Sequence, residues 1–180
     1  MKAKNVVIGV TASVACYKAL DVINGLRKLG AGVTVVLTKE TEGFIKPVLF
    51  QSVSGNKVIT HDMFNAPDEW DPAHISLARK ADCFAIIPAT ANIIGKIANG
   101  ICDDMLTCAV CATEAPVLLA PAMNTGMYRN KIVQANIKKL KQAGYHFTGP
   151  IEGCLACGIK GMGHIQDTGI IIKEIKQLIG

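Results

Sequence analysis

The segment NVVIGVTASVACYKALDVINGLRKLGAGVTVVLT, residues 5–38, decides the fold class. It opens with an apolar run at residues 5–11, and apolar residues then recur with helical spacing as far as Leu29. Gly30 ends this predicted helix, and a second β-branched run follows at residues 33–38. A strand, a helix and a strand in this order predict a βαβ unit whose two strands run parallel.

The same alternation continues to the end of the chain. Further helices are predicted near 47–53, from His74, and at 92–98, 104–113, 130–143 and 168–179, with strands at 58–60, 83–88, 117–120 and near His146. We therefore predict one α/β domain with a mostly parallel sheet and helices on both faces. Residues 62–72, with two prolines, and 149–163, with five glycines, are predicted to be long ligand-facing loops.

Composition narrows the class of protein. The 180 residues carry a net charge of +5, and their Lys and Arg residues are scattered, so the basic patch typical of nucleic-acid binding is missing. Half of the residues are apolar and only 18% are charged, which favours a homo-oligomer. The chain shows neither a signal peptide nor an apolar run of the ~20 residues that a membrane span needs. We expect a cytoplasmic protein that binds an anionic small molecule.

The seven cysteines are expected to be free thiols, since an odd number suits a reducing compartment. Cys108 and Cys111 have CxxC spacing in an apolar stretch, so we interpret them as buried helix core. Cys154 and Cys157 have the same spacing. A zinc site built from both pairs is possible by spacing, but neither pair lies in a polar, knuckle-like turn, so we expect no metal.

Polar segments follow the predicted strands, at the sheet edge where parallel sheets bind ligands. After the first strand, residues 11–18 combine small residues and hydroxyls before a helix N-terminus, which favours phosphate binding although the segment is neither G-x-G-x-x-G nor a Walker loop. PATAN at 88–92 and PAMNTGM at 121–127 end two more strands with amides and hydroxyls. ACGIKGMGH at 156–164 is predicted to be a flexible loop whose thiol could close over a ligand.

Five of these features occur in an order and spacing that resemble one family. They are ASVACYK at 12–18, His74 at a helix start, PATAN, PAMNTGM and ACGIKGMG at 156–163. Together, over nearly the whole chain, they resemble the flavin-dependent cysteine decarboxylases. The resemblance implies a flavodoxin-like, Rossmann-like fold, bound flavin mononucleotide (FMN), and trimers with the flavin at a subunit interface. It also implies that residues 1–180 form one flavoprotein domain with a substrate flap at about 150–165.

The resemblance also implies roles for individual residues. His74 corresponds to the family's active-site base, Cys157 to the proton donor on the flap, and Asn124 to the group that holds the substrate carboxylate. Met127 and Arg79 correspond to positions that shape the site and meet the substrate. The residues expected to contact the flavin are Ser13, Val14, Thr38, Thr90, Ala91, Asn92 and Ala122. His61, His146 and His164 have no such support and are interpreted as structural.

The implied reaction is decarboxylation of 4′-phosphopantothenoylcysteine to 4′-phosphopantetheine in coenzyme A biosynthesis. A saturated thiol has no sink for the electrons left when carbon dioxide departs, and oxidation to a thioaldehyde provides one. Alternatives are decarboxylation of a peptide's C-terminal cysteine, flavin prenyl transfer, which the cysteine-bearing flap disfavours, and a non-catalytic flavin-binding subunit. The presence of both His74 and Cys157 favours an enzyme. The sequence departs from the family at Ala12, commonly glycine, Tyr128, commonly tryptophan, and His164, usually arginine in the coenzyme A pathway.

Overall fold

A five-stranded parallel sheet forms the centre of the molecule in the computed structural model, which describes residues 4–60 and 73–180. The strand order is β2-β1-β3-β4-β5, and the strands are β1 (Asn5–Val10), β2 (Gly32–Leu37), β3 (Cys83–Ala89), β4 (Val117–Pro121) and β5 (His146–Phe147). All seven residues of β3 are buried, as expected for a central strand covered on both faces. The predicted α/β fold with a parallel sheet is confirmed.

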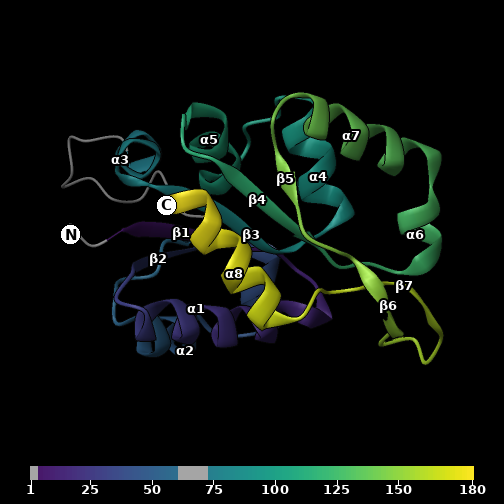
Figure 1. The fold of residues 1–180 in the computed structure, drawn as a ribbon, viewed down its shortest axis with the longest axis horizontal. Coiled ribbons are helices and arrows are strands. Elements are labelled where there is room, and N and C mark those ends of the chain that lie inside the picture. The colour runs from purple at the N-terminus through teal and green to yellow at the C-terminus, as the bar shows by residue number, and fades with distance from the viewer. Residues whose placement is uncertain (1–3, 61–72) are drawn as a thin grey trace.

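Helices cover both faces of this sheet (Figure 1). One face carries α1 (Lys18–Lys28), α2 (Pro47–Ser54) and α8 (Thr168–Ile179). The opposite face carries α3 (Ala73–Lys80), α4 (Ala91–Ala98), α5 (Met105–Ala112) and α7 (Lys131–Gln142). Strand side chains alternate between the two cores: Cys83, Ala85 and Ile87 enter the first, and Phe84 and Ile86 the second.

The direction of chain connection changes between β1 and β3. From β1 the chain continues to β2 on one side, and from β2 it crosses back to β3 on the other side. In a doubly wound sheet this change opens a crevice at the carboxyl ends of the two strands, where ligands bind. Thr11 directly follows β1 and Thr90 directly follows β3, so both lie at this crevice.

The glycine-rich segment predicted to be a flexible loop is instead an antiparallel hairpin. It consists of β6 (Ile151–Cys154) and β7 (Lys160–His164) and projects from one end of the molecule (Figure 1). Two glycines of β7 are explained by close packing: a Cβ on Gly163 would overlap the Met123 carbonyl oxygen, and one on Gly161 would overlap the Thr125 hydroxyl. The glycines therefore allow close backbone approach, which composition alone cannot distinguish from a loop.

Other elements depart from the prediction in smaller ways. The strand predicted at 58–60 is reduced to one parallel bridge between Ile59 and Val36. Three short helices were not predicted as separate elements: η1 (Val14–Tyr17), η2 (Lys39–Gly43) and α6 (Thr125–Arg129). The loop predicted at 62–72 lies outside the described residues.

The cysteine predictions need correction. Cys111 is exposed and Cys108 is half-buried, because both lie on the part of α5 that faces away from the sheet core. Helix α5 and the β6–β7 hairpin that carries Cys154 lie far apart (Figure 1), so the two CxxC pairs do not form one zinc site.

Within the described ranges, no helix is long and apolar enough to cross a membrane.

Candidate active site

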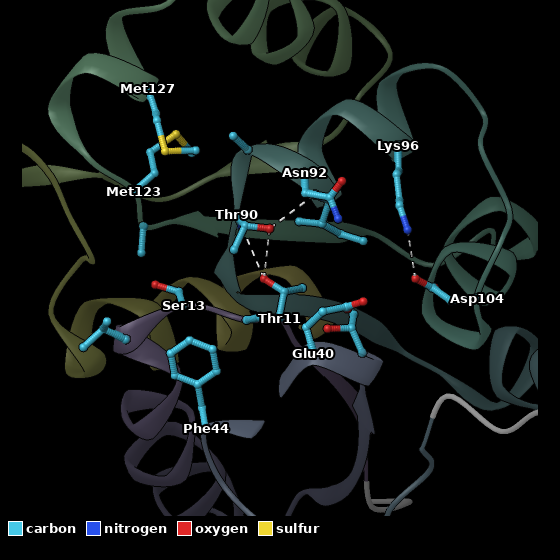
Figure 2. Close-up of a pocket in the computed structure, with 16 residues that line it drawn as sticks. Thr11, Ser13, Glu40, Phe44, Thr90, Asn92, Lys96, Asp104, Met123 and Met127 are labelled. Carbon is cyan, nitrogen blue, oxygen red and sulfur yellow. Dashed lines mark hydrogen bonds and ion pairs between the residues drawn. The ribbon is translucent and has the colours of Figure 1, made fainter. Parts of the chain in front are cut away.

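A cavity of about 420 Å³, here called the strand-end pocket, opens at the crevice between β1 and β3 (Figure 2). Its volume lies in the range typical of small-molecule sites. All seven residues predicted to contact a flavin line it: Ser13, Val14, Thr38, Thr90, Ala91, Asn92 and Ala122. They come from the ends of four strands and the first residues of α4 and η1, which the fold brings to one place.

Hydrogen bonds between strand ends hold the floor of this pocket. The Thr11 hydroxyl donates to the Pro88 carbonyl oxygen at 2.7 Å and accepts from the Thr90 backbone N–H at 3.2 Å. The Thr90 hydroxyl in turn accepts from the Ile93 N–H at 3.3 Å and so caps α4. Because these bonds join β1 to the start of α4, the two walls of the crevice are fixed relative to each other.

A second set of hydroxyls lies after β2 and β1. Thr38 and Thr41 share a hydrogen bond of 2.9 Å between their hydroxyls, and the Thr41 hydroxyl donates to the Val10 carbonyl oxygen at 3.0 Å. Ser13 caps η1 by accepting from the Ala15 N–H at 3.3 Å. Since η1 runs directly into α1, a helical N-terminus begins at Ser13, and the free N–H groups of such a terminus favour an anion.

The pocket also contains residues that sequence reasoning missed. Phe44, Met123 and the predicted Met127 give it apolar walls (Figure 2). Lys96 and Asp104 bring charges to the side formed by α4 and α5. Lys96 follows Asn92 by four residues on α4 and so shares its face, a spacing that could have indicated it. Asp104 lies at the start of the next helix, outside the recognised motifs, and no spacing indicated that it would face the pocket.

A second cavity of about 420 Å³, here called the flap pocket, lies between the β6–β7 hairpin and the end of β4. It shares Ser13, Val14, Ala122 and Met123 with the strand-end pocket, so the two cavities adjoin. The Asn124 side-chain amide donates to the Cys157 sulfur at 3.7 Å. Tertiary folding therefore brings together an amide and a thiol that lie 33 positions apart in the chain.

The orientation of Asn124 is set by the helix that follows it. Its side-chain oxygen accepts from the Gly126 N–H at 2.8 Å and caps α6, so the NH₂ group is the part left to face Cys157. The hairpin is tied to the same region, because the Met123 N–H donates to the Gly163 carbonyl oxygen at 3.1 Å. The thiol itself is exposed.

Two predicted residues are not brought to these cavities. His74 is half-buried and Arg79 is exposed, both on α3, and neither is among the residues that line either pocket. Figure 1 shows α3 and the hairpin at opposite ends of the molecule. Within one protomer, His74 and Arg79 therefore do not lie beside the residues that line the two pockets.

The remaining histidines are distributed as follows. His164, interpreted as structural from sequence, lines the flap pocket, and its Nδ1 lies 2.8 Å from the Ile165 carbonyl oxygen. A carbonyl oxygen can only accept a hydrogen bond, so Nδ1 is the donor in this contact. His146 is exposed on β5, and His61 lies outside the described residues. The described residues include no group of three or more His, Cys, Asp or Glu side chains arranged to hold a metal ion.

Comparison with known proteins decides the family. The sequence profile of the family described as Flavoprotein matches residues 1–180. This chain belongs to the Flavoprotein family. Two relatives illustrate its range. The chain is 44% identical over 170 residues to the coenzyme A biosynthesis bifunctional protein CoaBC of Bacillus subtilis, which covers 94% of this chain and 42% of that protein. It is 40% identical over 179 residues to a probable phosphopantothenoylcysteine decarboxylase of Streptococcus mutans, covering 97% and 98%.

Solved structures of this flavoprotein family share the fold. A mutant PPC decarboxylase complexed with pantothenoylaminoethenethiol superposes with a TM-score of 0.87 at 29% identity, covering 98% of each chain. The FMN-dependent cysteine decarboxylase SpaF superposes with a TM-score of 0.85 at 30% identity, covering 99% of this chain and 98% of that one. The chain spans less than half the length of CoaBC but nearly the whole of these shorter proteins.

Proposed function

We propose that this flavoprotein is an FMN-dependent phosphopantothenoylcysteine decarboxylase, a carboxy-lyase that converts 4′-phosphopantothenoylcysteine to 4′-phosphopantetheine in coenzyme A biosynthesis. The observation that carries the proposal is the contact between Asn124 and Cys157 in a flap pocket that adjoins the strand-end pocket. The full-length similarity to the Streptococcus mutans protein and to PPC decarboxylase supports it. From a biosynthetic role of this kind we infer that the protein is cytoplasmic.

The lining of the strand-end pocket fits FMN. Hydroxyls and the helix start at Ser13 suit the phosphate, and the apolar side chains of Phe44 and Met123 suit the flavin ring. The seven predicted contact residues would hold the cofactor. Bound FMN would supply the two-electron oxidation that turns the saturated thiol into a thioaldehyde, and would supply the two electrons for the reduction that follows the loss of carbon dioxide.

The flap pocket fits the cysteine end of the substrate. The uncharged amide of Asn124 orients the carboxylate without strongly stabilising the charge that has to leave as carbon dioxide. The Cys157 thiol lies beside the same amide and would deliver a proton to the carbon left by decarboxylation. The hairpin that carries Cys157 is the substrate flap, at about residues 150–165 of a single domain spanning 1–180.

We further propose that a trimer completes the site, with His74 of the partner subunit acting as the base and its α3 also supplying Arg79. Two features support this arrangement. Val14 and Phe44 line the strand-end pocket yet are 59% and 54% exposed, as apolar side chains at a subunit interface would be in an isolated protomer. Neither His74 nor Arg79 lines the pockets of its own protomer.

Decarboxylation of a peptide's C-terminal cysteine is the second candidate, favoured by the structural similarity to SpaF. The purified protein can be tested with both substrates. We expect absorbance and mass spectrometry to detect bound FMN. We also expect the protein to release carbon dioxide from phosphopantothenoylcysteine without any added cofactor. Turnover of a cysteine-ended peptide alone would assign the peptide reaction. Flavin binding without turnover of either would assign a non-catalytic flavin-binding subunit.

A further inference from the structure

The α4–α5 side of the strand-end pocket carries a compact group of three charges. The Lys96 ammonium lies 2.8 Å from an Asp103 carboxylate oxygen and 3.6 Å from an Asp104 oxygen. The side chains of Lys96 and Asp104 are only 22% and 16% exposed, and both line the pocket, whereas that of Asp103 is 53% exposed. Figure 2 shows the contact between Lys96 and Asp104 at one end of the cavity.

This arrangement is held rigidly by the start of α5. One oxygen of Asp104, Oδ1, accepts from both the N–H and the hydroxyl of Thr107 at 2.8 Å. The Asp104 N–H in turn donates to the Thr107 hydroxyl at 3.1 Å, which completes a capping box. The other oxygen, Oδ2, is the one that faces Lys96. The cap fixes the Asp104 carboxylate, and this carboxylate together with that of Asp103 holds the Lys96 ammonium at the pocket wall.

Lys96 is charged at neutral pH. Partial burial lowers the pKa of Lys96, but the hydrogen bond to Asp103 and the negative charges of Asp104 and Asp103 outweigh burial, so its pKa is raised. Among the described residues that line the pocket, Lys96 is the one cation, against the carboxylates of Glu40 and Asp104. The Lys96 ammonium has three N–H donors, and only two carboxylates contact it. One N–H group is therefore left to face the cavity.

We propose that Lys96 sets the reduction potential of the flavin bound in the strand-end pocket, and that Asp103 opposes it from outside the pocket. The inference rests on the proposed binding of FMN. A positive charge beside a flavin stabilises the electron-rich reduced form relative to the oxidised form, and a negative charge does the reverse. A reaction that takes two electrons from its substrate and then returns them needs a potential balanced between the two half-reactions, and opposed charges provide that balance.

The test compares charge changes of opposite sign at the two ends of one ion pair. Lys96→Gln removes the cation from the pocket wall and leaves Asp104 unopposed. Asp103→Asn removes a negative charge from an exposed loop position and leaves Lys96 less neutralised. Lys96→Arg keeps the charge. Lys28→Gln is the matched control, since it removes the same charge from an exposed position at the end of α1 that does not line the pocket.

The midpoint potential of bound FMN is measured by equilibration with a reference dye, alongside FMN titration and thermal unfolding of each variant. We expect Lys96→Gln to weaken binding of reduced FMN relative to oxidised FMN by about tenfold, which lowers a two-electron potential by about 30 mV. Asp103→Asn raises the potential, and Lys96→Arg and Lys28→Gln leave it close to that of the unchanged protein.

A merely structural role for the ion pair would not produce shifts of opposite sign, because breaking the pair from either side would loosen the same contact. Shifts in the same direction for Lys96→Gln and Asp103→Asn, or unchanged potentials in both while FMN is bound, would overturn the proposal. Should Lys96→Gln fail to fold, the sign of the change in midpoint potential caused by Asp103→Asn decides whether the proposal holds. Failure of the unchanged protein to bind FMN would instead refute the proposed function and, with it, this inference.

Discussion

At the scale of single residues, the flap carries two cysteines, Cys154 and Cys157, that differ in their surroundings. Cys157 accepts a hydrogen bond from Asn124, whereas Cys154, three positions earlier, makes its weak 3.9 Å contact with the Leu155 carbonyl oxygen. Both thiols are exposed and both line the flap pocket. Their shared exposure makes Cys154 a control for any effect of losing a flap thiol.

Replacing Cys157 separates the two halves of the proposed reaction. We expect Cys157→Ser to oxidise and decarboxylate the substrate once and then stop, because a serine hydroxyl is far less acidic than a thiol and does not deliver the final proton. Rapid mixing should show flavin bleaching and one equivalent of carbon dioxide. Cys154→Ser should turn over normally. Free turnover by Cys157→Ser together with a stalled Cys154→Ser would mean that the other thiol is the acid.

A buried thiol links residue chemistry to stability. Burial first, and the nearby Asp82 charge second, raise the pKa of Cys83 in β3 to about 12 from an ordinary value of 9.0. The folded state therefore holds its proton more tightly than the unfolded state. This contribution to the free energy of unfolding is fully present below pH 9 and is lost as the pH rises from about 9 toward 12. At pH 10 the loss amounts to about 1.4 kcal/mol.

Cys83→Ala removes this dependence. The free energy of unfolding is measured by chemical denaturation at pH 8 and at pH 10. Between these two pH values it should fall by about 1.4 kcal/mol less for the variant than for the unchanged protein. The lost packing destabilises the variant equally at both pH values and therefore cancels in this comparison. Equal falls for both proteins would show that the Cys83 thiol does not titrate differently on unfolding.

At the scale of elements, the β6–β7 hairpin depends on glycine for a reason that its sequence does not display. Gly163 has a φ of +139°, and a Cβ added to it would overlap the Met123 carbonyl oxygen. Gly158, at the tip, has a φ of +79° but open space around it. The two glycines thus separate backbone strain from close packing.

Gly163→Ala should therefore destabilise the hairpin more than Gly158→Ala does. The first combines an unfavourable φ with overlap of backbone, so we expect it to displace the hairpin from Met123 and to reduce decarboxylation strongly, with flavin binding kept. The second carries only the conformational cost, about 1 kcal/mol. Limited proteolysis of the hairpin and carbon dioxide release measure the two effects. Equal protease sensitivity of both variants would show that the Met123 contact does not hold the flap.

At the scale of the whole molecule, the separation of α3 from the hairpin makes a prediction about assembly. If His74 acts from a neighbouring copy, His74→Asn and Cys157→Ser damage the same site from different subunits. Each variant alone should retain flavin and fail to complete turnover. Coexpression of the two at equal levels should restore about a quarter of the normal activity, because a random assembly with heterologous interfaces pairs an intact His74 with an intact Cys157 at that frequency.

The mixed oligomers are compared with each parent variant, and their size is measured by light scattering. No activity in verified mixed oligomers would place both groups in one protomer and contradict the assembly. A lone active monomer would do the same.

Much of this molecule was accessible from the sequence because its signals are local. Side-chain periodicity and helix-ending glycines predicted the order of strands and helices, since both depend on neighbours a few positions apart. The polar strand ends predicted the edge of the sheet at which Ser13, Thr38 and Thr90 meet, since parallel strands of a doubly wound sheet share their carboxyl edge.

Tertiary structure alone decided what depends on approach between distant segments. The contact of Asn124 with Cys157 joins residues that are 33 positions apart, and no periodicity encodes it. The pairing of Lys96 with Asp103 and Asp104 spans fewer positions, but it depends on how the chain turns between α4 and α5. The sequence did not predict the hairpin for the same reason. Glycine is required at Gly163 because the backbone of Met123 packs against it, and Met123 is far away in sequence and close only in space.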